Sequence, residues 1–297
     1  MSGQILDGRA ISQELRNRIA EAAAAAARAG TRPGLATVLL GEHPASLSYI
    51  RGKQRACVEL GIHAEDVRLP AETEEAEVID RIVELNARPD IHGILVQQPL
   101  PPGFSEERIV AAINPSKDVD GFHPVNLGRL VRDVAGLVPC TPLGIVKMLE
   151  HAGVKTSGKR VAIVGRSLLV GKPLASLLMS KAETGNATVT VCHSRTPDLR
   201  DVTSGAEILV AAIGRPRFIT AEMVRDGAVV IDVGINRVDD ASRKRGYRLV
   251  GDVDYDAVAP KASLITPVPG GVGPMTVTML LYNTVQAARG LTSYDPL

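Results

Sequence analysis

The chain has 297 residues, of which 45% are hydrophobic and 23% charged, with 34 basic and 33 acidic side chains. This length suits two domains of ordinary size, and the composition excludes a disordered chain. A formal net charge of +1 provides no overall field to attract nucleic acid or an anionic membrane. The sequence therefore favours a small-molecule partner.

The cysteines, histidines and N-terminal residues predict a soluble, cytoplasmic protein without a bound metal. Cys57, Cys140 and Cys192 form no C-x-x-C pattern, so we expect them to be reduced. The histidines show neither i, i+4 spacing nor a neighbouring cysteine pair, so no metal site is expected. The first residues lack the basic start and apolar run of a signal peptide, and no apolar stretch is long enough to span a membrane.

Apolar, β-branched runs alternate with helix-length amphipathic segments, which is typical of parallel sheets covered by helices. Strands are predicted at 35–40, 64–69 and 93–97, and then at 160–164, 188–192, 208–211, 229–233 and 263–266. The alanine-rich run at 21–27 predicts a surface helix, because alanine has the highest helix propensity. The charge-rich segment at 239–248 predicts a solvated loop.

A proline-containing segment at 139–142 precedes an amphipathic helix and marks the predicted domain boundary. We predict an α/β protein with a three-layer catalytic domain over residues 1–138 and a Rossmann-like, parallel-sheet dinucleotide-binding domain over 139–273. We expect a cleft between the domains. The C-terminal helix within 274–297 is expected to pack back on the first domain.

A glycine-containing turn follows the predicted strand at 160–164 and precedes a predicted helix over 172–182. Gly165 can adopt a tight turn, Gly171 lets the helix approach the strand, and free N–H groups at the helix start can bind phosphate. The spacing departs from G-x-G-x-x-G, because Ser167 occupies the middle position. We interpret this turn as a site for a dinucleotide diphosphate, with a purely structural turn as the alternative.

The strand at 188–192 ends without the acidic residue that NAD sites usually carry to bind the ribose 2′-hydroxyl. Ser194 and Arg195 follow this strand instead, and Arg166 lies in the first turn. Their hydrogen-bond donors and positive charge suit a 2′-phosphate. The sequence therefore favours NADP as the cofactor.

Tyr49 and Lys53 lie four residues apart in a predicted helix, so a hydroxyl and an amine share one helix face. A surface pair at this spacing is common and identifies no site by itself. Short-chain dehydrogenases also contain Y-x-x-x-K, but there the motif follows the dinucleotide turn, whereas Tyr49 precedes Gly165. Chain order therefore disfavours that family.

Three further segments present polar or rigid residues where α/β proteins form their sites. Gln97 ends a predicted strand, and the carboxyl ends of strands carry ligand sites in such folds. Asp118 and Asp120 place two carboxylates on the same side if their segment is extended, although paired aspartates in loops are usually turn formers or solvated charges. The small, rigid residues at 267–276 allow a ligand to approach the backbone closely, with an interdomain hinge as the alternative.

Several of these segments together resemble the bifunctional methylenetetrahydrofolate dehydrogenase and methenyltetrahydrofolate cyclohydrolase family, over nearly the whole chain. The segments are PASLSYIRGK at 44–53, GILVQQPLP at 93–101, KDVDGFHPVNLGRL at 117–130, PCTPLGI at 139–145, VGRSLLVGKP at 164–173 and PVPGGVGPMT at 267–276. Gln98 departs from the family, which commonly has a hydrophobic residue at this position.

The resemblance implies NADP-dependent oxidation of 5,10-methylenetetrahydrofolate and hydrolysis of the methenyl product to 10-formyltetrahydrofolate. It also implies roles for individual residues. Lys53 helps to activate water, Gln97 orients Lys53, Tyr49 packs on the aromatic part of the folate, and Asp120 binds the pterin. The expected cofactor-binding residues are Gly165, Arg166, Ser167, Ser194, Arg195 and Ile235, and further substrate contacts are expected from Pro269, Gly270 and Gly273.

The resemblance further implies a homodimer formed through the dinucleotide-binding domains. Two alternatives stand beside the bifunctional enzyme. One is a monofunctional dehydrogenase that has lost the hydrolase, which the presence of both Lys53 and Gln97 argues against. The other is a dinucleotide-binding sensor without chemistry, which has no use for Tyr49, Lys53, Gln97 and Asp120 together.

Overall fold

The computed structural model describes residues 3–41, 44–243, 245–295 and 297, with the backbone alone at 44–49. The chain forms two compact units. The six-stranded unit comprises Met1–Ser12 and Thr141–Thr276, and the three-stranded unit comprises Gln13–Cys140 and Val277–Leu297. Among the described residues, no helix is both long and apolar enough to cross a membrane.

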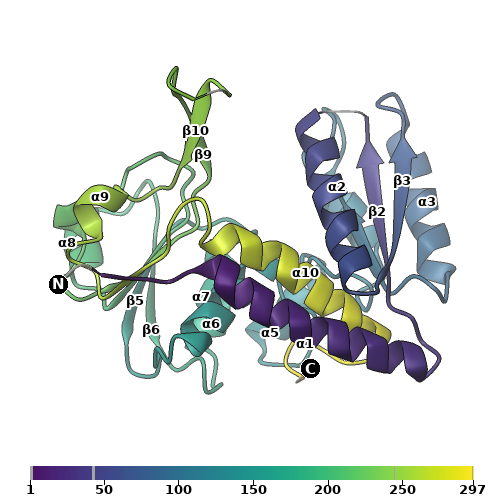
Figure 1. Ribbon diagram of the computed structural model, residues 1–297, viewed down its shortest axis with the longest axis horizontal. Helices are drawn as coiled ribbons and strands as arrows, with labels where there is room; N and C mark the ends of the chain where they lie inside the picture. Colours follow the sequence, from purple (N-terminus) through teal and green to yellow (C-terminus); the bar gives the residue numbers. More distant parts are fainter. Residues whose placement is uncertain (1–2, 42–43, 244, 296) are drawn as a thin grey trace. The chain divides into compact units, whose positions relative to one another are not determined.

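The three-stranded unit is a small parallel sheet with helices on both faces. Its strands β2 (Gly34–Leu40), β3 (His63–Leu69) and β4 (Gly93–Val96) are arranged in the order β3-β2-β4. Helices α2 (Pro44–Glu59) and α3 (Glu75–Ala87) lie on opposite sides of this sheet (Figure 1). Shorter helices follow at Glu106–Ala112 (α4) and Pro124–Val131 (α5).

Alternating side chains of the strands build the core of this unit. Val38 and Ile94 pack with Val78 and Ile82 of α3 and with Ile109 of α4, all of them buried. Burying these branched side chains supplies the main stabilisation of the unit, at about 25 cal/mol per Å² of apolar surface.

Two long helices, α1 (Gly8–Arg28) and α10 (Val272–Ala288), complete this unit with most of their length. They lie side by side in Figure 1. A hydrogen bond of 3.2 Å joins them, donated by Arg16 Nε of α1 to Thr278 Oγ1 of α10. The C-terminal helix thus belongs mainly to the same unit as residues 13–140.

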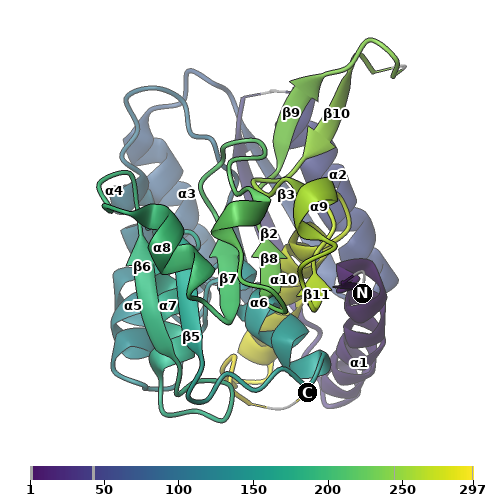
Figure 2. The ribbon, with the colours of Figure 1, turned by 90° about the vertical axis from the view of Figure 1, so that its left-hand side faces the viewer.

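The six-stranded unit is a parallel sheet in the order β1-β11-β8-β7-β5-β6, seen in Figure 2. Each neighbouring pair in this order is parallel, and the sheet buries an apolar cluster that includes Ala162, Leu209 and Val230. The strands are β1 (Gln4–Ile5), β5 (Arg160–Val164), β6 (Thr188–Cys192), β7 (Ile208–Ala211), β8 (Val229–Asp232) and β11 (Leu264–Ile265). The connecting helices are α6 (Cys140–His151), α7 (Gly171–Met179), α8 (Leu199–Ser204) and α9 (Tyr255–Val258), with a 3₁₀ turn at Ala221–Met223.

The predicted strands are all present, with ends that differ by at most a residue or so, and both units are α/β. The structure adds β1, which pairs with β11 and places the first residues in the six-stranded unit. The prediction placed these first residues in an N-terminal domain of 1–138, with the three-stranded sheet. It missed β1 because a two-residue edge strand is too short to leave a periodic pattern in the sequence.

The structure also contains an antiparallel hairpin of β9 (Asn236–Asp239) and β10 (Tyr247–Val250), which projects from the sheet in Figure 1. The sequence predicts a loop at 239–248, and the structure corrects this prediction at Asp239, Tyr247 and Arg248. Tyr247 pairs with Asp239 and Arg248 with Val238 in the ladder, so the loop is confined to the turn. The strands of the hairpin escaped prediction because each has only four residues and the segment between them is rich in charge.

Candidate active site

Helix α2 and strand β4 bring Lys53 and Gln97 together. Lys53 Nζ donates a hydrogen bond of 2.9 Å to Gln97 Oε1. Gln97 directly follows β4, and its backbone N–H donates to Val38 O of β2 at 2.8 Å, which holds the residue at the carboxyl edge of the sheet. Its Nε2 donates to Gln98 O at 2.7 Å, so the amide presents its oxygen to the lysine.

The charges of Lys53 and Asp120 are coupled. Burial lowers the pKa of Lys53 from its usual value, and the nearby Asp120 carboxylate opposes that shift. Burial raises the pKa of Asp120 to about 6, with Lys53 lowering and Asp118 raising it. The unit therefore holds an amine that loses its proton more easily than usual next to a carboxyl that keeps its own longer.

Asp118 and Asp120 have different surroundings although they lie two residues apart. Asp118 is 1% exposed and accepts hydrogen bonds from the backbone N–H of Gly121 and His123, at 3.2 and 2.8 Å, and from Asn126 Nδ2 at 2.8 Å. Asp118 thus shapes the loop that carries Asp120, whereas Asp120 is partly exposed. Both aspartates line a small cavity together with Gln98. Of the two, Asp120 is the more accessible.

Cys140 is a buried, neutral thiol next to this group. Its Sγ donates to Val119 O at 3.2 Å, and burial raises its pKa well above the usual value. A thiol with a raised pKa is a poor nucleophile, since the thiolate is the reactive form. Cys140 therefore packs and donates a hydrogen bond beside Asp120.

Asn283 of α10 is a residue that the sequence analysis missed. It is fully buried, and its Nδ2 donates to Val119 O at 2.9 Å and to Val138 O at 3.0 Å. Its Oδ1 accepts a hydrogen bond of 2.7 Å from Ser293 Oγ. The segments that precede Asp120 and Cys140 are thereby tied to the C-terminal helix. A polar amide within an apolar helix was the signal that could have revealed it.

Tyr49 lies in α2, one helical turn before Lys53, and its side chain is outside the described part of the structure. Gln98 is exposed, and its carbonyl oxygen accepts the Gln97 amide hydrogen bond while its Oε1 accepts from Leu100 N–H at 3.2 Å. The unusual Gln98 thus takes part in positioning Gln97 through its backbone, which any residue could supply.

In the six-stranded unit, the turn after β5 requires glycine at two positions. Gly165 has a φ of +133°, and a Cβ there would lie 2.1 Å from Ala212 O. A Cβ on Gly171 would lie 2.1 Å from Gly165 O, so the start of α7 packs directly on the turn. Ser167 Oγ accepts a hydrogen bond of 3.1 Å from Val170 N–H, which shapes the bend between them. Such a close backbone cradle before a helix N-terminus suits a diphosphate.

Arg166, Ser194 and Arg195 are exposed at the carboxyl edges of the adjacent strands β5 and β6. The two loops are tied together where Gly165 N–H donates to Cys192 O at 2.9 Å. Arg195 N–H also donates to His193 Nδ1 at 3.1 Å, which orders the second loop. The predicted positively charged residues therefore share one edge of the sheet, and no acidic side chain follows β6 there.

Ile235 and the loop before α10 meet in the same unit. Ile235 is 56% exposed, and a Cβ on Gly273 would lie 3.4 Å from Ile235 Cδ1. Gly270 has a φ of +114°, which favours glycine, and Pro269 is exposed beside it. A predicted cofactor residue thus lies next to the loop predicted to contact the substrate.

Two buried carboxylates that the sequence analysis missed hold the loops at this edge. Asp232 ends β8 and accepts hydrogen bonds from the N–H groups of Asp252 and Val253 at 2.9 and 3.0 Å, and burial raises its pKa to about 6. Asp252 accepts from Ile213 and Gly214 N–H at 2.7 and 2.9 Å. Asp252 also accepts a hydrogen bond of 2.9 Å from Asn236 Nδ2. The hydrogen-bonding capacity of both carboxylates is thus used within the unit, where they hold the loops at this edge of the sheet.

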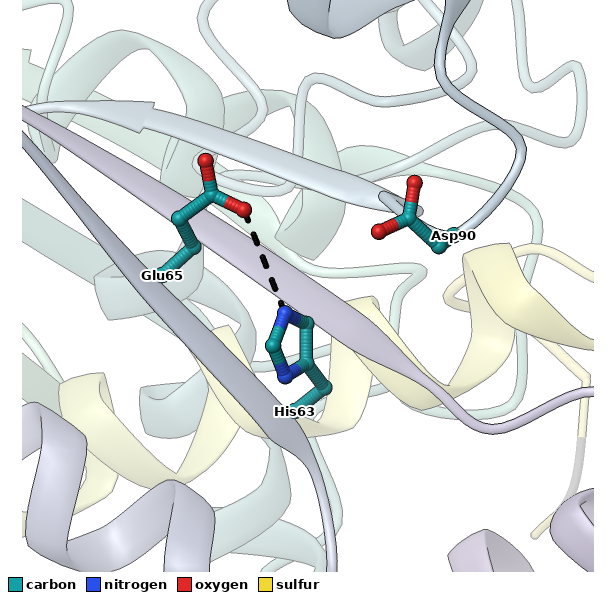
Figure 3. A group of neighbouring side chains, drawn as sticks. All are labelled: His63, Glu65 and Asp90. Atoms are coloured by element: carbon teal, nitrogen blue, oxygen red, sulfur yellow. Dashed lines mark ion pairs between the residues drawn. The ribbon is translucent and has the colours of Figure 1, made fainter.

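A group that could hold a metal lies elsewhere in the three-stranded unit. His63, Glu65 and Asp90 are close together in Figure 3, with His63 Nε2 3.9 Å from Glu65 Oε2. Arg88 donates to Glu65 Oε1 at 2.7 Å and to Asp90 Oδ2 at 2.6 Å, so a guanidinium already neutralises both carboxylates. We interpret the group as an ion-pair network at the amino edge of the sheet.

Two family models cover most of the chain. The catalytic domain of tetrahydrofolate dehydrogenase/cyclohydrolase matches residues 6–120, and the NAD(P)-binding domain of the same family matches residues 139–292. A protein named bifunctional protein FolD from Chlorobium phaeobacteroides is 53% identical over 98% of this chain and 99% of its own length. A protein of the same name from Desulfovibrio desulfuricans is 54% identical over 97% and 99%.

Solved structures of this family share the fold. The bifunctional FolD enzyme of Campylobacter jejuni has a TM-score of 0.92 with 41% identity, covering 97% of this chain and 99% of that one. The Trypanosoma brucei enzyme, solved with NADP and an inhibitor, has a TM-score of 0.91 with 40% identity, covering 98% of both chains. The chain belongs to the tetrahydrofolate dehydrogenase/cyclohydrolase family.

Proposed function

We propose that this protein oxidises 5,10-methylenetetrahydrofolate with NADP and hydrolyses the resulting 5,10-methenyltetrahydrofolate to 10-formyltetrahydrofolate. Family membership over the full length supports both activities. The observation that carries the hydrolytic step is the 2.9 Å hydrogen bond between Lys53 Nζ and Gln97 Oε1. A dehydrogenase without the hydrolase activity has less need of a lysine hydrogen-bonded to a glutamine.

In the proposed oxidation, the protein positions its reactants more than it exchanges protons with them. A bound NADP would supply the acceptor for the hydride that leaves the one-carbon unit, and the substrate nitrogen would stabilise the cation left behind. Gly165 and Gly171 form the backbone cradle for the diphosphate, while Arg166 and Arg195 supply charge for the 2′-phosphate. We assign Ile235 to the same cofactor-binding group.

In the proposed hydrolysis, Lys53 takes a proton from the water that attacks the methenyl carbon. The bond from this carbon to N5 then breaks, the hydroxyl of the adduct becomes the formyl C=O, and its proton passes to N5. A free lysine is almost fully protonated at neutral pH, so this role needs the lowered pKa that burial causes here. The positive charge of the methenyl substrate lowers it further. Gln97 accepts a hydrogen bond from Lys53 and holds the amine in place.

Several residues are proposed to contact the folate. We assign Asp120 to the pterin N–H groups, a pairing that its negative charge strengthens. Tyr49 is assigned to the aromatic part of the folate, and Pro269, Gly270 and Gly273 to close backbone contact with the substrate.

A single time course tests the proposal against its alternatives. The protein is mixed with NADP and 5,10-methylenetetrahydrofolate, and the absorbance of the methenyl species is followed. We expect this species to form and then to be consumed faster than it decays in buffer. A dinucleotide sensor would form none, and a monofunctional dehydrogenase would accumulate it without enzymatic decay.

We further infer a homodimer joined through the six-stranded units. The family resemblance supports this assembly, and the two-stranded sheet of β9 and β10 is consistent with it, because an isolated hairpin is marginally stable in water. Sedimentation velocity would give the mass in solution, and a monomer would contradict the inference.

We also assign the protein to the cytoplasm. Cys57, Cys140 and Cys192 are free thiols, as expected in a reducing compartment.

A further inference from the structure

Helix α10 carries an amide at a position where its neighbours are apolar. Asn283 is 0% exposed, and Leu280, Leu281 and Val285 of the same helix are buried as well. A buried amide costs free energy unless its donors and its acceptor are paired. The proposed reaction does not use Asn283, so the groups that it binds must explain its place in the core.

The hydrogen bonds of Asn283 join two segments that are distant in the sequence. Its Nδ2 donates to Val119 O at 2.9 Å and to Val138 O at 3.0 Å. Val119 directly precedes Asp120, and Val138 lies two residues before Cys140. Asn283 therefore holds the backbone on the N-terminal side of the carboxylate that we assign to the pterin.

Ser293 completes this arrangement. It is 3% exposed, and its Oγ donates to Asn283 Oδ1 at 2.7 Å while accepting from Val138 N–H at 2.9 Å. Its own N–H donates to Gly136 O at 3.1 Å. We call Asn283 and Ser293 the amide–serine clamp, because together they fix the backbone at 136–138 and at Val119.

The same helix also holds the turn that carries Ser293. Tyr282 OH donates to Asp295 O at 2.7 Å, and Gln286 Nε2 donates to the same oxygen at 2.7 Å. Tyr282 and Gln286 belong to α10, as Asn283 does. The helix thus determines the position of both members of the clamp.

Asp120 is consequently held from both sides along the chain. On its C-terminal side, the Asp118 carboxylate binds the backbone N–H groups at 121 and 123. On its N-terminal side, the Val119 carbonyl accepts from Asn283 and also from Cys140 Sγ, at 3.2 Å for the thiol. Loss of the Asn283 amide would release the carbonyl next to Asp120, and a shift of that peptide turns the carboxylate.

We propose that Asn283, supported by Ser293, is a positioning residue that holds the Asp120 carboxylate in the orientation that binds the pterin N–H groups. This inference rests on the proposed function, which assigns Asp120 to the pterin. The pterin does not react, so its contact has similar strength in the ground state and in the transition state. A displaced Asp120 should therefore raise KM and leave kcat nearly unchanged.

A double-mutant cycle on the full-length protein tests whether Asn283 acts through Asp120. Calorimetry measures the dissociation constant of folate, and steady-state kinetics measures KM and kcat for oxidation of 5,10-methylenetetrahydrofolate. We expect Asn283→Ala to raise the dissociation constant and KM about three- to tenfold, with kcat within about twofold. In an Asp120→Asn background the same replacement should change the dissociation constant less than about twofold, because the group that it positions is already altered.

The matched control is Thr284→Ala. Thr284 is the next residue of α10 and is fully buried, but its Oγ1 donates to Leu280 O within the helix, at 2.8 Å. Urea unfolding should show a loss of stability in this variant, while its folate affinity and KM stay as in the wild type. If Asn283→Ala does not fold, Ser293→Ala replaces it in the cycle. This milder variant keeps the Asn283 amide, and we expect a rise of about two- to threefold.

Three results would overturn the proposal. They are an equal loss of affinity from Asn283→Ala with and without Asp120→Asn, an equal loss in Thr284→Ala, and a fall in kcat with unchanged folate affinity. If Asp120→Asn itself leaves the affinity unchanged, the pterin assignment fails and the positioning role fails with it. If the cycle shows coupling but 5,10-methylenetetrahydrofolate is not oxidised, the positioning role stands and the proposed function fails.

Discussion

At the scale of single residues, the surroundings of Lys53 explain how a lysine could serve as a base at neutral pH. Burial lowers the pKa of Lys53 because it favours the neutral amine, while Gln97 Oε1 accepts a hydrogen bond from Lys53 Nζ and holds it in place. Asp120 provides a nearby negative charge that limits the shift. The spacing of Tyr49 and Lys53 predicted a shared helix face, but only the fold placed Gln97 against the lysine.

Replacing Lys53 should separate the two activities. We expect Lys53→Met to reduce the cyclohydrolase rate about 100-fold or more, because general base catalysis typically contributes about 10²–10⁴. Oxidation should fall much less, because hydride transfer depends on positioning. Separate assays of the two steps, with Arg55→Met at an exposed position on the same helix as the control, measure the effect. Normal cyclohydrolase activity in Lys53→Met would exclude Lys53 as the base.

Asp120 predicts a pH dependence of folate binding. Its pKa is raised to about 6, so the carboxyl is neutral below that pH and ionised above it. If the ionised form binds the pterin N–H groups, the dissociation constant of folate should be lowest above pH 6 and rise about tenfold at pH 5. Calorimetry between pH 5 and 8 measures this, and Asp120→Asn should bind more weakly with a flatter profile. An unchanged affinity across this range would contradict the role of Asp120.

At the scale of elements, the turn from β5 into α7 was predictable because its demands are local. The turn follows a strand directly, contains glycines, and leads into the start of a helix. The structure leaves no room for a Cβ at Gly165 or Gly171. The neighbouring loop after β6 belongs to the same site because β5 and β6 pair in parallel. Strand pairing is a long-range property. The alternation of strands and helices in the sequence indicates a parallel sheet, but it does not say which strands are neighbours.

The charges on these two loops should determine the choice of dinucleotide. We expect the double variant Arg166→Ala and Arg195→Ala to lower the preference for NADP over NAD about 10- to 100-fold, because charge-assisted contacts to a phosphate are lost. The ratio of kcat/KM for the two cofactors measures this change. Arg160→Ala is the control, since Arg160 lies at the opposite end of β5 and is exposed. An unchanged ratio in the double variant would show that other groups select the cofactor.

The hairpin of β9 and β10 shows where local patterns fail. Its residues read as a charged loop, and Arg237 and Tyr247 stack with 3.8 Å between the guanidinium and the ring centroid. Cross-strand contacts of this kind stabilise a ladder that hydrophobic alternation does not reveal. The same arginine-rich segment also lines a cavity of the six-stranded unit, together with Arg217 and Pro269.

At the scale of the whole molecule, segments from distant parts of the chain build each unit. The first residues pair with β11, and α10 at the other end of the chain contributes Asn283 to the segments beside Asp120 and Cys140. Neither assignment follows from sequence periodicity, because both depend on which surfaces meet after folding. The resemblance to a known family identified the chemistry. The order of the family motifs along the sequence did not predict the pairing of β1 with β11 or the hydrogen bonds of Asn283.

The sequence by itself determined the α/β class, nearly every core strand, the dinucleotide turn and the residue types of the site. These follow from local physics, namely side-chain periodicity, glycine geometry and the absence of an acid after β6. Only the tertiary structure decided that Gln97 accepts a hydrogen bond from Lys53, that Asp118 is buried and shapes a loop while Asp120 stays partly exposed, and that arginines gather beside the loop at 267–269. Distances between remote residues and the burial of their charges arise from packing, which no short stretch of sequence contains.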